Sequence, residues 1–426
     1  MLSDEVLERI VERLAIRIED ANTYTLKKIA KSIKKIGQAK TSDLRELEQI
    51  LKYGGDYDKI IRRLAKMTEL NVKDIKDIFR EVAKKDYEFA EKFYKYRNIK
   101  YIPFDENVAL KNQVDALANI TASEYINLSN TSAIGFSIKD LRGRTIFQNL
   151  GDTYRNVIDE AVLSVSQGKS TFDEQMYKII KELGSSGLKT VNYATGRSIR
   201  LDSAIRMNMR GALRSLHNEM QEQFGEDFGY NGIEVSHHVN SAPDHIDTVD
   251  GKQFVLVDKV QEQINNGIET EIKQEDIRGN QVKVKGKTYD DFNAVNNSLD
   301  RPVSTLNCRH YTFSIIVGVS KPEYTQEQLD EDKKKNLDGF EFEGKHYSLY
   351  DGEQLLQKVE LELRKSKDTQ IIARSSNNTE LVGEMQSRIT QLTSKYRDIL
   401  KVSGLKSKLE RARVPQYRRI NVKNMK

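Results

Sequence analysis

The sequence of 426 residues has one cysteine, no tryptophan and only 5 prolines. A single cysteine excludes an internal disulfide, which is compatible with a reducing compartment. Scarce proline favours long helices, because proline inside a helix removes a hydrogen bond. No stretch approaches the ~20 apolar residues that span a bilayer, and residues 1–5 have neither a basic region nor an apolar run. We therefore expect a soluble cytosolic product without a secretory signal or membrane span.

The composition is rich in charge and lean in core-forming residues, with 31% charged and 38% hydrophobic residues. Such a composition suits extended helical segments better than one compact globule. Lys and Arg number 69 and Asp and Glu number 64, which gives a net charge of +5. This excess is too small for a dedicated nucleic-acid binder. The length allows two or three domains of roughly 100–200 residues each.

Apolar residues at three- and four-residue spacing predict helices at both ends of the chain. In a helical N-terminal region, residues 1–190, the predicted helices cover 6–18, 24–36, 44–53, 56–68, 72–85, 107–128, 150–167 and 171–183. Aromatic residues from Tyr87 to Tyr101 have helical spacing and favour packing against another helix, with base stacking as the alternative. In a helical C-terminal region, residues 323–426, helices are predicted from Asp351 onward and over 380–402.

The end of the chain is strongly basic, because the residues after Leu405 contain a single acid, Glu410. A DNA contact is physically reasonable there, and a tail that anchors on an acidic protein surface is an equal alternative. The candidate DNA-contact residues are Arg411, Arg413, Arg418, Arg419 and Lys423.

Residues 191–322 read as a small α/β core. An amphipathic helix is predicted over 201–224, and short β-prone runs at 232–236, 254–257, 281–284 and 311–317 predict a small antiparallel sheet. The predicted fold is therefore mainly α with a small α+β central domain. Elongated helical N-terminal and C-terminal arms surround the small antiparallel sheet.

Four of the six histidines and the only cysteine lie between Val235 and His310. Cys308 and His310 are two residues apart, so an extended strand would point both side chains to one face. With His238 and His245 from a loop they form a candidate set of zinc ligands. The spacing does not match the short-loop pairs of the common zinc modules.

The same residues allow two other interpretations. In the one we favour, His238, His245, Asn307 and Arg309 form a buried hydrogen-bond network, and Cys308 is a small core residue. The other is catalytic: Cys308 as a thiolate nucleophile, or His245 with Asp244 or Asp247 as a general base. Apart from the candidate structural zinc, we expect no cofactor.

The central region carries several short motifs in a fixed order. They are Tyr193-Ala194-x-Gly196-Arg197, Glu234-Val235-Ser236-x-His238, Pro243-x-His245, Gly251-Lys252 and Asn307-Cys308-Arg309-His310. The ordered set resembles the minor capsid proteins of tailed bacteriophages, of the minor capsid protein 2 type, which are related to Mu F-like head-morphogenesis proteins. Two positions depart from that pattern. Ala242 stands where the family usually has arginine, and Val249-Asp250 replace a Trp-Gln pair.

The resemblance implies a structural protein of the virion rather than an enzyme. It implies a location inside the capsid near the portal vertex and a role in head assembly, with genome packaging or ejection as a further expectation. Implied partners are the portal protein, major capsid or scaffolding proteins, and packaged DNA. The motif residues implied to be structural are Tyr193, Gly196, Arg197, Ser236, Gly251, Lys252, Asn307 and Arg309.

Two other classes of function remain open from the sequence. One is a metal-dependent nuclease or hydrolase centred on His238, His245, Cys308 and His310. The other is a DNA-binding accessory protein that uses Arg206, Arg210 and the basic tail.

Overall fold

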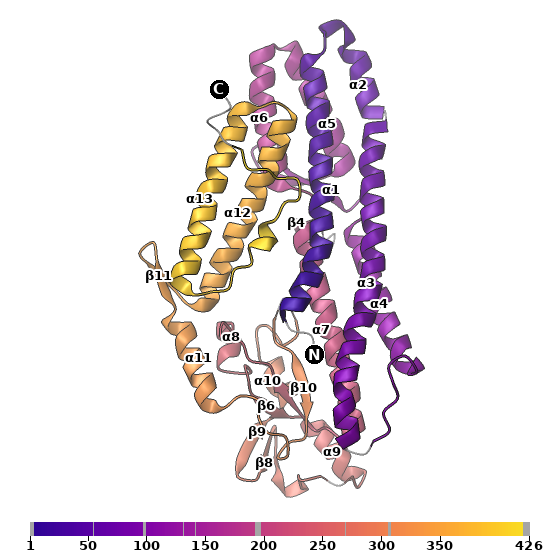
Figure 1. Cartoon of the computed structure of the whole chain (residues 1–426), viewed down its shortest axis with the longest axis vertical. Coiled ribbons are helices and arrows are strands. Elements are labelled where there is room, and N and C mark those ends of the chain that lie inside the picture. Colours follow the sequence, from indigo (N-terminus) through magenta and orange to yellow (C-terminus); the bar gives the residue numbers. More distant parts are fainter. Residues whose placement is uncertain are drawn as a thin grey trace.

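The computed structural model describes residues 4–420 apart from 54, 97–98, 131, 141, 192–196, 269 and 306–307. Long helices follow the long axis of the molecule, and a β-rich unit lies at one end (Figure 1). The helices of the N-terminal part are α1 (Asp4–Gln38), α2 (Leu44–Tyr53), α3 (Gly55–Tyr96), α4 (Val108–Leu128), α5 (Leu150–Ser166) and α6 (Lys169–Ser186). They are followed by α7 (Leu201–Phe228), and the C-terminal pair α12 (Leu349–Ser375) and α13 (Thr379–Ser403) lies beside them.

Helices α1 and α3 are each continuous where the sequence predicted breaks, so those predicted boundaries are wrong. In both helices a buried polar residue interrupts the apolar pattern without interrupting the helix. Asn22 of α1 donates through Nδ2 to Oδ2 of Asp368 at 3.0 Å. Asn71 of α3 donates through Nδ2 to the hydroxyl of Tyr125 at 2.8 Å. Because tertiary partners satisfy these amides, they are tolerated inside the core.

A four-stranded antiparallel sheet, which was not predicted from the sequence, lies within the helical part. Its order is β2-β1-β3-β4, with β1 (Ile134–Lys139), β2 (Thr145–Asn149), β3 (Lys189–Val191) and β4 (Ser198–Arg200). At Gly135 of β1 a side chain would come closer than 3.0 Å to the backbone of Gln148 and Asn149. The close pairing of β1 and β2 therefore requires glycine at this position.

The β-rich unit confirms a small antiparallel sheet packed by the central helix, but the predicted run 281–284 belongs to a second sheet and Val257 begins a helix. Its main sheet has the order β10-β5-β6, formed by β5 (Gly232–Val235), β6 (Gln253–Val255) and β10 (Thr312–Ile315). Ser314 of β10 donates to the carbonyl of Gln221 on α7 at 2.7 Å. A second sheet and three short helices complete the unit: β7 (Ile277–Arg278), β8 (Gln281–Val284), β9 (Lys287–Asp290), α8 (Pro243–Ile246), α9 (Val257–Asn265) and α10 (Phe292–Asn297).

The chain returns from this unit to the helical part through α11 (Gln326–Asp338) and the hairpin of β11 (Phe340–Phe342) and β12 (Lys345–Tyr347). After α13 a 3-10 turn, Leu409–Ala412, lies against α12. Three short 3-10 segments occur in all among the described residues, the others being Thr41–Asp43 and Gln274–Asp276. The fold is mainly helical with small antiparallel sheets, as predicted.

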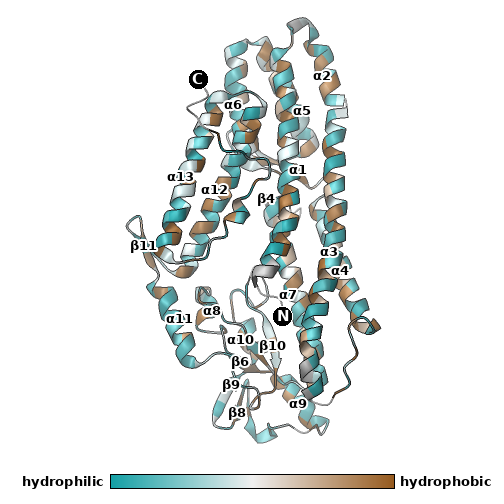
Figure 2. Ribbon diagram, viewed as in Figure 1, coloured by the Kyte–Doolittle hydropathy of each residue, from teal (hydrophilic) through white to brown (hydrophobic). Residues whose placement is uncertain are grey.

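One hydrophobic core runs through the helices of the first half and includes Ile372 and Leu381 of the C-terminal pair. Figure 2 shows hydrophobic and hydrophilic residues alternating along the long helices, as expected for amphipathic helices. None of the described helices is long and apolar enough to span a membrane.

A buried ionic network lies where α1, α7 and α12 meet. Arg200 pairs with Glu19 at 2.7 Å and with Asp368 at 2.9 Å. Arg206 pairs with Glu12 at 2.7 Å. These five side chains are buried and come from both ends and the middle of the chain. The network therefore fixes the two helical regions and α7 to one another.

Candidate metal and hydrogen-bond site

The register of the main sheet brings the histidine motifs and the cysteine motif together. Val235, the last residue of β5, pairs with Thr312, the first residue of β10. The strands are antiparallel, so the segment after Val235 and the segment before Thr312 leave the sheet at the same end. Helix α8 follows the first of these segments and carries His245 back toward the second.

His245, Cys308 and His310 form one cluster. The Nδ1 atoms of the two histidines lie 3.1 Å apart, and the Sγ of Cys308 lies 3.7 Å from Nδ1 of His245 and 3.4 Å from Nδ1 of His310. Both imidazoles are buried and the thiol is partly buried. The structure thus brings together three of the four residues predicted as metal ligands.

His238, the fourth predicted ligand, is not part of that three-residue group. Its Nε2 lies 3.0 Å from the backbone carbonyl of Arg309, to which it donates, and 3.4 Å from Oγ of Ser236. This nitrogen therefore joins the loop after β5 to the segment before β10.

Asp250 is the centre of a hydrogen-bond network that sequence reasoning missed. Its Oδ1 accepts from the backbone N–H of His238 at 3.0 Å, from the hydroxyl of Ser241 at 3.0 Å and from Nε2 of His310 at 2.7 Å. Its Oδ2 accepts from Nδ1 of His237 at 2.6 Å. The only sequence signal was an acidic residue beside a turn glycine, because the loop that folds back on Asp250 and the contact with His310 cannot be seen in the sequence.

The electrostatics of the network follow from these contacts. Burial opposes ionisation of Asp250, but hydrogen bonds from His237 and His310 outweigh it and lower the pKa of that carboxyl. Burial alone would lower the pKa of His310, yet Asp250 and Cys308 raise it to about 9. Burial alone would raise the pKa of Cys308, but hydrogen bonds with His245 and His310 lower it to about 5. Without a bound metal, Cys308 and His310 would therefore form a thiolate–imidazolium pair. A thiolate is also the form of cysteine that binds metals.

The other motif residues shape the backbone around this site. Oγ of Ser236 accepts from the N–H of Tyr311 at 2.9 Å. Gly251 has a φ of +69°, a backbone conformation that other residues rarely adopt, so glycine is favoured at this turn.

The backbone carbonyl of Lys252 accepts from the N–H of Val235 at 2.9 Å, and its side-chain Nζ donates to the carbonyl of Asp247. Arg309 pairs with Glu353 of α12, which links the β-rich unit to the C-terminal helices. Arg197 is exposed. Tyr193, Gly196 and Asn307 lie outside the described residues.

The structure divides the candidate DNA-contact residues. Arg413, Arg418 and Arg419 are exposed, and Lys423 lies outside the described residues. Arg411 is instead buried and pairs with Glu8 at 2.7 Å, which corrects its assignment as a surface contact.

Arg206 and Arg210, proposed from the sequence as DNA contacts, are also engaged within the protein. The guanidinium of Arg206 is buried and pairs with Glu12 at 2.7 Å. Arg210 pairs with Glu8 at 2.8 Å. Both arginines hold α7 to α1, which corrects that part of the DNA-binding hypothesis.

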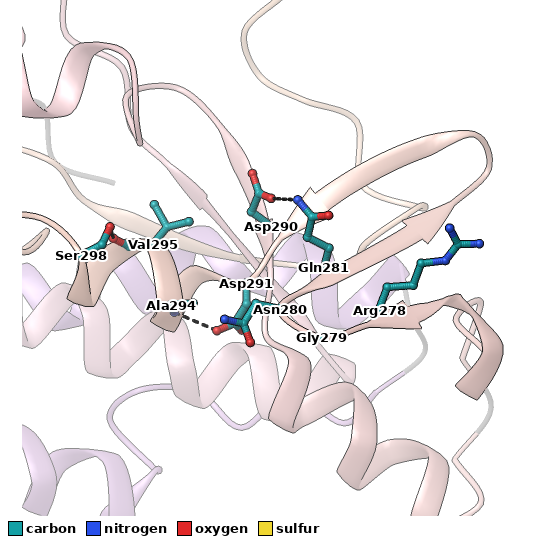
Figure 3. Close-up of a pocket in the computed structure, with 9 residues that line it drawn as sticks. All are labelled: Arg278, Gly279, Asn280, Gln281, Asp290, Asp291, Ala294, Val295 and Ser298. Atoms are coloured by element: carbon teal, nitrogen blue, oxygen red, sulfur yellow. Dashed lines mark hydrogen bonds between the residues drawn. The ribbon is translucent and has the colours of Figure 1, made fainter.

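A hollow of about 540 Å³ lies elsewhere in the β-rich unit, between the β7–β8 turn and α10 (Figure 3). Its carboxylates are already bonded: Asp290 accepts from Nε2 of Gln281 at 2.6 Å, and Asp291 caps α10 through the N–H of Ala294 at 2.8 Å. Its lining residues are Arg278, Gly279, Asn280, Gln281, Asp290, Asp291, Ala294, Val295 and Ser298. No member of the histidine–cysteine cluster lines this hollow.

Comparison with known families places the chain among the structural proteins of phage particles. The family model for phage minor capsid protein 2 matches residues 2–401. The chain therefore belongs to the phage minor capsid protein 2 family, which confirms the resemblance seen in its motifs. Searches of curated proteins and of solved structures found no match.

Proposed function

We propose that this minor capsid protein acts inside the phage head at the portal vertex, where it takes part in head assembly. The observation that carries the proposal is the family match, which covers the helical body and the β-rich unit together. Family membership indicates a structural protein of the virion that contacts other capsid components. The portal protein as partner and the interior location are the finer steps of this proposal.

The buried ionic network supports a structural role. Arg200 and Arg206 of the central segment pair with Glu19 and Glu12 of α1, and Arg200 also pairs with Asp368 of α12. A buried ion pair is costly to break, because the remaining partner is left as an uncompensated charge. The helical body is therefore suited to transmit force or hold a fixed spacing between partners.

The outer face of α4 is the surface we assign to the portal contact. In a chain with 31% charged residues, this helix of 21 residues has only Lys111, Asp115 and Glu124. Ile120 is 58% exposed and Ile126 is 46% exposed on that face. We infer that these two isoleucines take part in a protein–protein contact, because contiguous exposed apolar surface marks such sites.

Co-expression with the portal protein of the same phage tests the proposal. We expect the full chain to co-migrate with the portal oligomer in size-exclusion chromatography. The double variant Ile120→Lys with Ile126→Lys is expected to lose this association while it keeps its helical circular dichroism. Leu163→Lys on α5 is the matched control, because Leu163 is equally exposed at 58% but lies on another helix. Binding to capsid shells without portal, and none to the portal oligomer, would contradict the proposal.

We extend the proposal to packaged DNA through the exposed Arg413, Arg418 and Arg419. Three phosphate contacts predict a slope of log K against log salt of about −3 for duplex DNA. Replacing all three arginines by glutamate is expected to abolish this binding. The matched control replaces the exposed Lys283, Lys285 and Lys287 of the β8–β9 hairpin by glutamate, with the same change of charge. Equal loss in both variants would indicate a non-specific charge effect and contradict this extension.

A further inference from the structure

The histidine–cysteine cluster has the separations of a tetrahedral metal site. In such a site, Zn–N bonds of about 2.0–2.1 Å and a Zn–S bond of about 2.3 Å place two nitrogens about 3.3 Å apart and a nitrogen and the sulfur about 3.6 Å apart. The cluster has 3.1 Å between the two Nδ1 atoms, and 3.4 and 3.7 Å from these atoms to Sγ of Cys308. Three corners of a tetrahedron are therefore already in place.

The hydrogen bonds of the two imidazoles turn both Nδ1 atoms into ligands. Nε2 of His245 lies 2.6 Å from the backbone carbonyl of Arg301, which can only accept, so this nitrogen carries the proton. Nε2 of His310 lies 2.7 Å from the carboxylate of Asp250. In neutral rings both Nδ1 lone pairs then face each other across 3.1 Å. Two facing acceptors repel unless a proton or a cation lies between them.

The partners of the distal nitrogens are those typical of metal-binding histidines. Histidines that bind metals almost always donate the other ring N–H to a carboxylate or a backbone carbonyl, which fixes the tautomer and the ring orientation. The cluster has one of each, in Asp250 and in the carbonyl of Arg301. Asp250 is itself held by the hydroxyl of Ser241 and the N–H of His238.

We propose that Nδ1 of His245, Nδ1 of His310 and Sγ of Cys308 bind one zinc ion, with Asp250 as the positioning residue for His310. Imidazole and thiolate together select zinc over magnesium or calcium, which prefer oxygen ligands. The ion joins α8 to the segment that leads into β10, at positions 63 residues apart in the chain. It closes the β-rich unit at the end of its main sheet, and this role does not depend on the portal partnership proposed above.

The rival to zinc is a proton, which would make the cluster a thiolate–imidazolium pair and leave Cys308 available as a nucleophile. Cobalt substitution separates the two directly. Co²⁺ in a tetrahedral site with a thiolate has a sulfur-to-metal charge-transfer band and intense visible bands, and a protonated cluster has neither. This measurement uses the full-length wild-type protein, so it does not depend on whether a variant folds.

The test is to purify the full chain under reducing conditions and measure its zinc by mass spectrometry, followed by exchange for Co²⁺. We expect about one zinc per chain and a charge-transfer band. We expect Cys308→Ser to lose the band, and Asp250→Asn to bind zinc about 10–100-fold more weakly. His346→Ala, at an exposed histidine of β12, is the control that keeps both signals. Zinc content near zero together with no band in the wild-type protein would overturn the proposal.

Discussion

Arg200 and Asp368 are 168 residues apart in the chain, yet Nη2 of the arginine lies 2.9 Å from Oδ2 of the aspartate. The same Nη2 lies 2.7 Å from Oε1 of Glu19. One guanidinium therefore joins the N-terminal helix, the start of α7 and the C-terminal pair of helices. Both carboxylates are buried, and burial beside Glu19 raises the pKa of Asp368.

Replacing Arg200 by methionine is expected to destabilise the whole helical body. The substitution leaves Glu19 and Asp368 without their shared cation, and breaking a buried ion pair on one side costs about 3–5 kcal/mol. Urea unfolding followed by circular dichroism measures this loss. Arg13→Met is the control, because Arg13 pairs with Asp74 at 3.3 Å but its side chain is 55% exposed, so about 0–1 kcal/mol is expected. Equal losses in the two variants would contradict the role of the network.

Glu8 predicts a specific dependence of stability on pH. Burial alone would raise its pKa, but Arg210 and Arg411 outweigh it and hold the pKa at about 2, below the ordinary value of 4.5. A carboxyl whose pKa is lower in the folded state than in the unfolded state stabilises the fold at a pH above its unfolded-state pKa. That contribution is lost as the pH falls toward its folded-state pKa. The difference in unfolding free energy between wild type and Glu8→Gln should therefore shrink by about 1–2 kcal/mol between pH 6 and pH 3.

The control for this pH series is Glu81→Gln, because Glu81 is exposed and pairs only one helical turn away with Lys85. The difference in unfolding free energy between this variant and wild type is expected to change by no more than about 0.5 kcal/mol between pH 6 and pH 3. If the wild-type and Glu8→Gln curves keep a constant separation from pH 6 to pH 3, the charge of Glu8 is not what Arg210 and Arg411 stabilise.

The helices were predictable where one face is apolar and the ends carry turn residues. Helix α13 was expected over 380–402 and occupies Thr379–Ser403, and α5 was expected over 150–167 and occupies Leu150–Ser166. The breaks predicted within α1 and α3 fail at Asn22 and Asn71, whose partners come from α12 and α4. The hydrophobic periodicity of the sequence predicts that a polar residue is exposed. It cannot show that a side chain distant in the sequence hydrogen-bonds to the amide of an asparagine.

The candidate site was predictable in the same partial way. The pair Cys308 and His310 could be placed together from local spacing alone, and His245 joins them only because α8 folds back. Nε2 of His238 instead donates to the backbone carbonyl of Arg309, which lies 71 residues further along the chain. Asp250 gained its role from four donors in the folded structure, so no short motif could have identified it.

Truncation of His310 to alanine is expected to lower the melting temperature even in the presence of a metal chelator. The change removes the hydrogen bond to Asp250 and the contact with the hydroxyl of Ser241, both inside the core of the β-rich unit. A buried charge that loses a partner costs about 1–3 kcal/mol. Differential scanning calorimetry in chelator measures the change, with His346→Ala as the control. An unchanged melting curve for His310→Ala would count against the placement of this segment before β10.

Two helical glycines should respond in opposite directions to the same substitution. Gly184 of α6 faces α12 so closely that an added Cβ would come closer than 3.0 Å to Cα of Thr369. Alanine there must push the two helices apart, which is expected to cost about 1–3 kcal/mol. At Gly211 of α7 an added Cβ meets no atom within 4 Å, so Gly211→Ala should gain about 0.5–1 kcal/mol from the lower entropy of the unfolded chain. Unfolding free energies from urea titration give both values. If Gly184→Ala is as stable as Gly211→Ala, then α6 and α12 do not need a glycine to pack at this distance.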